Sequence, residues 1–136
     1  MNIPELLFRF ALASPPVAHT RIAAALVHKR QVLAFGRNQY KTHPLQAQYG
    51  KNEQSIYLHA EIDAIARAWG NLEGEPLRRG SRRGTVLYIL RIKRESSRGK
   101  YVLGLAKPCI GCMRAIIAFG IDRVCYSTNE RSMVWL

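Results

Sequence analysis

Runs of hydrophobic residues predict the strands of a central sheet in this chain. Four segments have the length and apolar content of strands, and they cover residues 21–29, 31–39, 85–93 and 123–127. The first two segments meet at Lys29 and Arg30, which leaves room only for a tight turn. These two strands are therefore expected to pair antiparallel, as a hairpin.

Apolar residues at helical spacing predict three helices. The first is amphipathic, with apolar side chains along one face at Ile3, Leu6, Leu7 and Phe10. Because Glu5 and Arg9 interrupt its apolar residues, a helix is favoured over a secretory signal. The second helix, over 58–69, is apolar on most sides and should be buried. The third covers 109–119 and ends at Gly120.

The order of these elements predicts the architecture. The third helix connects the strands at 85–93 and 123–127, and a strand–helix–strand unit implies a parallel crossover. Residues 133–136 follow too soon for another helix, so a last strand there should return antiparallel. A polar loop is expected over 40–54. A polar hairpin tip is expected over 96–99, with extended chain resuming after it. The prediction is an α/β fold, a three-layer α/β/α arrangement with a mixed sheet of about five strands.

His59, Ala60 and Glu61, together with Pro108, Cys109 and Cys112, form an H-x-E…P-C-x-x-C pattern. This pattern is the sequence signature of zinc-dependent base deaminases. His59 can supply a ring nitrogen, and two cysteines three residues apart can present both sulfurs from one helical turn. Three protein ligands leave the fourth position of a tetrahedral zinc ion open for water, which is typical of catalytic rather than structural zinc. Zn²⁺ is the expected cofactor.

Glu61 is the expected catalytic residue. It lies two residues after a ligand, close enough to reach a zinc-bound water without binding the metal itself. Zinc lowers the pKa of such a water to roughly 7, and a carboxylate beside it can carry protons from the water to the substrate. The expected reaction is hydrolytic deamination.

The cysteine pair alone has two other interpretations, a redox-active pair and half of a zinc ribbon. A redox-active C-x-x-C pair would leave His59 and Glu61 without a role, and a zinc ribbon would need a second ligand pair. Cys125, the third and last cysteine, lies in an apolar strand and is expected to be a buried free thiol. So few cysteines indicate a reducing compartment, and we expect a cytoplasmic protein of one domain, residues 1–136, with no membrane-spanning segment.

The segments 21–39, 59–68 and 106–127 resemble the cytidine deaminase-like superfamily. The resemblance implies its fold, with His59, Cys109 and Cys112 as zinc ligands and Glu61 as the proton shuttle. It also implies that Asn38, at the end of the second strand, contacts the substrate sugar. Ala60 and Pro108, next to the ligands, are the other expected substrate contacts.

The resemblance leaves the subfamily and the substrate open. A final antiparallel strand resembles the branch that contains free-cytidine deaminases and bacterial deaminase toxins, whereas deoxycytidylate, tRNA-adenosine and antibody-diversifying enzymes usually place a helix there. A free cytosine nucleoside or nucleotide is the leading candidate. Single-stranded DNA or RNA is the alternative, followed by adenine, guanine or another amino-heterocycle.

The net positive charge and its concentration in one segment are compatible with a nucleic-acid substrate. The net charge is +12, and nine of the 21 Lys and Arg residues fall within 78–100, against the single acid Glu95. Such a basic segment could follow a phosphate backbone, although free nucleotides also carry phosphate and charge runs commonly cover a solvated face. A basic zinc-binding module without turnover is the alternative from another class. Homo-oligomerisation is left open.

Overall fold

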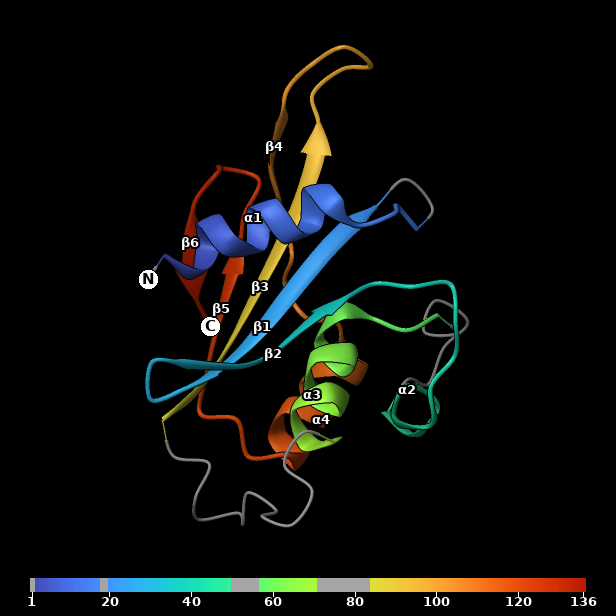
Figure 1. The fold of residues 1–136 in the computed structure, drawn as a ribbon, viewed down its shortest axis with the longest axis vertical. Helices are drawn as coiled ribbons and strands as arrows, with labels where there is room; N and C mark the ends of the chain where they lie inside the picture. The colour runs from blue at the N-terminus through green and yellow to red at the C-terminus, as the bar shows by residue number, and fades with distance from the viewer. Residues whose placement is uncertain (1, 18–19, 50–56, 71–83) are drawn as a thin grey trace.

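The computed structural model describes residues 2–17, 20–49, 57–70 and 84–136 and shows a mixed sheet with helices on both faces (Figure 1). Its strands are β1 (Arg21–His28), β2 (Gln31–Arg37), β3 (Thr85–Arg94), β4 (Tyr101–Gly104), β5 (Arg123–Ser127) and β6 (Met133–Trp135). The order along the sheet is β2-β1-β3-β5-β6, and β4 pairs with the end of β3. This confirms the predicted α/β class.

The strand directions follow the expected pattern. β1 pairs antiparallel with β2 and β3, whereas β3 and β5 are parallel and are connected through α4 (Ile110–Ala118). β6 returns antiparallel to β5, as predicted. The sheet has six strands rather than about five because the segment after the hairpin tip pairs with β3 as β4. The tip itself closes where Gly99 N donates to Ser96 O over 3.0 Å.

Two apolar cores cover the two faces of the sheet. On one face α1 (Ile3–Ala13) packs Leu7 and Ala11 against alternate residues of β1 and β3. On the other face α3 (Ala60–Gly70) and α4 pack against the intervening residues of the same strands. β1 is buried on both faces because it lies between β2 and β3 under both layers. The amphipathic first helix is therefore confirmed.

Gly36 allows α3 to lie directly on β2. A Cβ atom at this position would be 2.3 Å from Ala64 N and 2.4 Å from Ala60 O, both backbone atoms of the helix. No side chain fits in that space, so the close approach of helix and strand depends on glycine. This contact brings the first turn of α3 to the edge of the sheet where the site described below is found.

The structure adds a short helix, α2 (Pro44–Tyr49), inside the segment expected to be a polar loop. The buried residue of α2 is Gln46. Because this residue is polar, the segment shows no apolar periodicity from which a helix could be predicted. α3 begins at Ala60 rather than at residue 58, because Leu58 is extended and forms a β-bridge with Gln39. Residues 50–54 of that segment and 78–83 of the basic segment lie outside the described residues. None of the described helices has the length and apolar content of a membrane span.

Candidate active site

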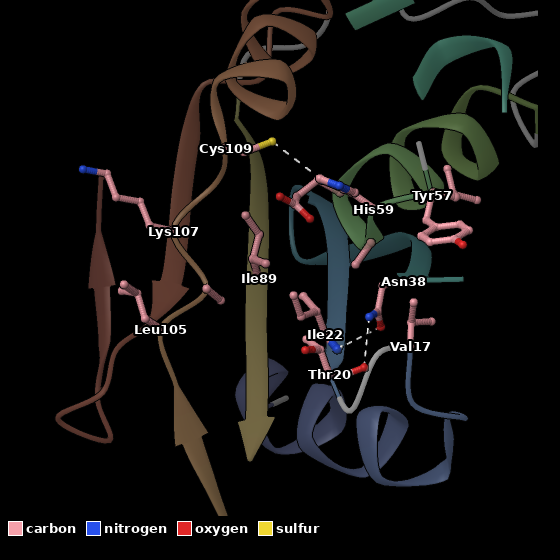
Figure 2. A pocket seen from close by; sticks show the side chains of 14 residues that line it. Val17, Thr20, Ile22, Asn38, Tyr57, His59, Ile89, Leu105, Lys107 and Cys109 are labelled. Atoms are coloured by element: carbon pink, nitrogen blue, oxygen red, sulfur yellow. Dashed lines mark hydrogen bonds between the residues drawn. The ribbon is translucent and has the colours of Figure 1, made fainter. Parts of the chain in front are cut away.

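His59 is held at the start of α3 by its backbone. Its carbonyl oxygen accepts from Asp63 N over 3.0 Å, which is the first hydrogen bond of the helix. Its own N–H donates to Gln46 Oε1 over 3.1 Å. The helix and the neighbouring α2 therefore fix the backbone of His59 from two sides, and its ring extends toward α4 (Figure 2).

Cys109 and Cys112 form the start of α4. Cys109 is the N-cap residue, and its Sγ accepts from Cys112 N over 3.4 Å, an interaction that serine or aspartate makes at most helix starts. Cys109 reaches solvent, whereas Cys112 is fully buried. The cap bond and the single helical turn place both sulfurs at one helix end, where the helix dipole favours a thiolate.

The two helix starts bring three metal-binding atoms together. His59 Nδ1 lies 3.6 Å from Cys109 Sγ and 3.3 Å from Cys112 Sγ, and the three donor atoms lie within 4.8 Å of one another. Ligands at zinc distances of about 2.0 to 2.3 Å in a tetrahedron are roughly 3.5 Å apart. One imidazole and two thiols at this spacing therefore fit a zinc ion, with one tetrahedral position left to a non-protein ligand.

The two thiols differ sharply in acidity. The pKa of Cys109 is lowered to about 4, chiefly because the Cys112 thiol donates a hydrogen bond to it, with further help from His59. The pKa of Cys112 is raised, because that donated bond and its burial both favour the protonated form. Without metal the pair thus keeps one proton on Cys112, and a metal that binds both sulfurs must displace it.

Glu61 lies in the first turn of α3, one residue beyond Ala60, and only 6% of it is exposed. Burial raises the pKa of its carboxyl, while the positive charge of His59 and a hydrogen bond with Cys112 act in the opposite direction. A buried carboxyl with a raised pKa exchanges protons closer to neutrality than an exposed one. Glu61 therefore has the environment of a general acid–base group beside the metal-binding atoms.

A cavity of about 350 Å³ opens in front of these residues (Figure 2). His59, Ala60, Glu61 and Cys109 line its inner end. Much of the remaining wall is apolar, from Val17, Ile22, Leu58, Ile89, Leu105 and Ala106. Such a volume suits a small molecule with a flat apolar face. Pro108 is buried directly before Cys109 but is not among the residues that line this cavity.

Asn38 lines the cavity and also ties the start of β1 to the end of β2. Its Oδ1 accepts from Ile22 N, and its Nδ2 donates to Thr20 O, both over 3.0 Å (dashed lines in Figure 2). Both ends of the amide are therefore used inside the protein. Asn38 thus has a structural role that sequence reasoning did not identify, in addition to its position at the cavity.

Two buried polar residues behind the site were missed from the sequence. Asp63 is 4% exposed and accepts from Arg37 N at 3.0 Å, Gln39 Nε2 at 2.9 Å and Arg67 Nε at 3.0 Å, which anchors α3 to the end of β2. Gln46, 1% exposed, orients the backbone of His59. Asp63 could have been suspected, because it is a carboxylate on the apolar side of a buried helix. The sequence carried no comparable signal for Gln46.

Comparison with known proteins adds to this geometry. A family model described as the cytidine and deoxycytidylate deaminase zinc-binding region matches residues 4–128. No curated protein matches the chain in sequence. Two crystal structures of dCMP deaminase from the cyanophage S-TIM5, one in apo form and one in complex with dCMP and dUMP, have a similar fold, with TM-scores of 0.55 and 0.54. Each is 20% identical to this chain, covers 90% of it, and is itself covered to 76% and 75%.

Proposed function

This chain belongs to the cytidine and deoxycytidylate deaminase zinc-binding family, and on that premise we propose that it hydrolyses the cytosine base of a nucleoside or nucleotide to uracil, releasing ammonia. His59, Cys109 and Cys112 would hold the zinc ion that the family requires. The observation that carries the proposal is the position of Glu61. A buried carboxyl shares one cavity with the metal-binding atoms, and a purely structural zinc site has no use for it.

Glu61 carries the protons of the reaction. When bound, zinc supplies an activated water at neutral pH. Glu61 would accept a proton from the attacking water and pass it to N3 of the ring as the water oxygen bonds to C4. Glu61 would then move the proton of the new C4 hydroxyl to the exocyclic amine, so that the C4–N bond breaks and ammonia leaves as the C4 carbonyl forms. Water and cytosine are consumed and uracil and ammonia are produced, so the atoms balance.

The cavity around Glu61 would orient the base. Ile22 and Ile89 offer apolar surface to the faces of the ring, and Ala60 lies beside the reacting end. Asn38 is proposed to contact the sugar through the second lone pair of Oδ1 or the second N–H of Nδ2, since each end of its amide makes one hydrogen bond inside the protein. Pro108 would contribute indirectly, by setting the direction of the chain before Cys109.

Two lines of support point to different forms of the substrate. The antiparallel β6 favours the branch that contains free-cytidine deaminases. The structurally similar crystal structures are dCMP deaminases, one of them in complex with dCMP and dUMP, which favours a nucleotide. The base and the reaction are the same in both cases, so only the sugar and phosphate part of the substrate distinguishes them.

A substrate panel tests the proposal. The zinc-loaded protein would be incubated with cytidine, deoxycytidine, their monophosphates, adenosine and guanosine, and ammonia would be measured. We expect release from at least one cytosine compound, and loss of that release after the metal is removed by a chelator. Release only from adenosine or guanosine would contradict the choice of base. A zinc-loaded protein inert toward every nucleoside, nucleotide and oligonucleotide would favour the non-catalytic module.

A further inference from the structure

A second hollow lies where β3 extends beyond its neighbour β1. β1 begins at Arg21, which pairs with Ile92, so the last two residues of β3 pair only with β4. A cleft of about 560 Å³ lies at this end of the strand, lined mainly by Arg21, Lys93, Arg94, Ser96, Ser97 and Tyr101. We call it the hairpin cleft. It shares no lining residue with the cavity of the candidate active site.

The hairpin cleft concentrates positive charge without a compensating acid. The guanidinium carbon atoms of Arg21 and Arg94 lie 5.1 Å and 4.7 Å from the centre of the Tyr101 ring. Arg21 also donates to the Tyr101 hydroxyl over 2.7 Å, and its buried Nε finds no acceptor among the described residues. Among the described residues, no Asp or Glu lines the cleft. Two arginines held against one ring, with two serine residues nearby, suit an anion such as phosphate.

The hairpin cleft and the active-site cavity lie on either side of one short stretch of chain. Pro16 and Arg21 line the cleft, whereas Val17, Thr20 and Ile22 line the cavity. Val17 and Thr20 are joined by two backbone hydrogen bonds of 2.9 Å and 2.8 Å. Successive residues of β1 point to opposite faces of the sheet, so Arg21 and Ile22 face different hollows. An anion that uses both hollows must pass from the side of Arg21 to the side of Ile22, as a chain of phosphates can.

The mouth of the cavity carries the aromatic surface that a flanking base would need. Tyr57 lines the cavity and is 42% exposed. Its ring meets that of Tyr40, which is 61% exposed, edge to face with centroids 5.3 Å apart. Proteins that bind single strands combine such exposed rings with a positive groove. Tyrosines that only pack would be expected to be buried.

We propose that the hairpin cleft binds the phosphodiester backbone of a single-stranded nucleic acid whose cytosine lies in the active-site cavity. The proposal rests on the proposed function, because it assigns the substrate of the same site. It favours a polymer over a free nucleotide. Backbone phosphates in the cleft position the strand, and the cavity reads the base turned out of it.

Binding measured against salt concentration tests the hairpin cleft without requiring turnover. The zinc-loaded full chain would bind a fluorescein-labelled single strand of about 12 nucleotides, a length within the site sizes of single-strand-binding folds. Arg21→Gln combined with Arg94→Gln removes two charges from the cleft. Lys29→Gln combined with Arg30→Gln is the matched control, because it removes the same charge at the opposite end of β1. A strand with cytosine and one without it are compared.

Each phosphate contact on a single strand contributes about 0.7 to the slope of log affinity against log salt. We expect the Arg21 and Arg94 double variant to lose about 1.4 from this slope, and the control to keep the native value. Between 50 and 200 mM salt, the native protein should then lose about sevenfold more affinity than the cleft variant. Arg94→Gln alone should lose about 0.7. Because Arg94 is exposed and donates only to Ser97 O, this variant keeps the test valid if the double variant does not fold.

Two results would overturn the proposal. A native slope in both cleft variants would make the cluster a solvated face. A cleft variant that weakens dCMP as much as the single strand would assign the cleft to the phosphate of one nucleotide. Neither result depends on deamination. A chain that binds strands as expected but releases no ammonia would refute the proposed function and leave the cleft assignment standing.

Discussion

Gly36→Ala tests whether the close packing of α3 against β2 positions the candidate active site. The added Cβ would meet Ala64 N at 2.3 Å and Ala60 O at 2.4 Å, and neither backbone atom can rotate away. To reach ordinary van der Waals separation, α3 must retreat from β2 by roughly 1 Å. His59 and Glu61 lie at the end of the helix that moves, so stability and chemistry should both suffer.

The expected size follows from two effects of opposite sign. Forcing an extra carbon into a packed interface typically costs about 1 to 3 kcal/mol, and backbone contacts this short favour the upper end. Replacing glycine also stiffens the unfolded chain, which returns about 0.4 to 1 kcal/mol. The net loss in the free energy of unfolding should therefore be about 2 kcal/mol. A shift of about 1 Å in catalytic groups can lower turnover by roughly a hundredfold.

Gly104→Ala is the matched control for Gly36→Ala. Its Cβ would lie 3.3 Å from Lys93 Cδ and 3.4 Å from Arg91 Cδ, both in flexible side chains that can move. Urea unfolding of the zinc-loaded proteins, together with ammonia release, would measure both effects. We expect Gly104→Ala to differ from the native protein by less than about 1 kcal/mol. If Gly36→Ala matched this control in stability and rate, the close packing of α3 on β2 would not be what positions the site.

Three further substitutions, with one comparison variant, separate metal binding, anchoring and substrate contact. Cys112→Ser should reduce zinc from one ion per chain to nearly none by elemental analysis, and full occupancy would remove Cys112 from the ligand set. Asp63→Asn should cost about 1 to 3 kcal/mol in urea unfolding because it weakens buried hydrogen bonds. Arg67→Gln, at a side chain 52% exposed, should cost less than about 1 kcal/mol, and equal losses would contradict the buried anchor. Asn38→Ala should lower stability by about 1 to 3 kcal/mol, because Ile22 N loses its acceptor, and should raise KM for the substrate. Unchanged stability and KM together would remove Asn38 from both roles.

The sequence predicted what depends on apolar periodicity and on ligand spacing. The strands, the crossover through α4 and the antiparallel β6 all follow from the pattern of buried side chains. The grouping of His59, Cys109 and Cys112 was predicted because only these residue types at these spacings suit zinc.

What could not be predicted depends on contacts between segments distant in the sequence. Gln46 is buried because its amide meets the backbone of His59, 13 residues away, and no local pattern encodes that. Asn38 closes the start of β1 through Thr20 and Ile22, which depends on the register of the hairpin. The placement of Arg21 and Arg94 against Tyr101 required β1 to begin opposite Ile92, two residues before β3 ends. Polar contacts of this kind depend on how distant segments come together in the fold, so they cannot be predicted from local sequence patterns.

In the proposed reaction, Glu61 moves protons during a zinc-dependent deamination and does not bind the metal. The direct measurement compares Glu61→Gln with the native protein in zinc content and in ammonia release from a cytosine substrate. We expect one zinc ion per chain in both proteins and a rate about 10² to 10⁴ times lower in the variant, because a general acid–base group is lost. A Glu61→Gln variant that keeps its zinc and turns over at nearly the native rate would contradict this role of Glu61.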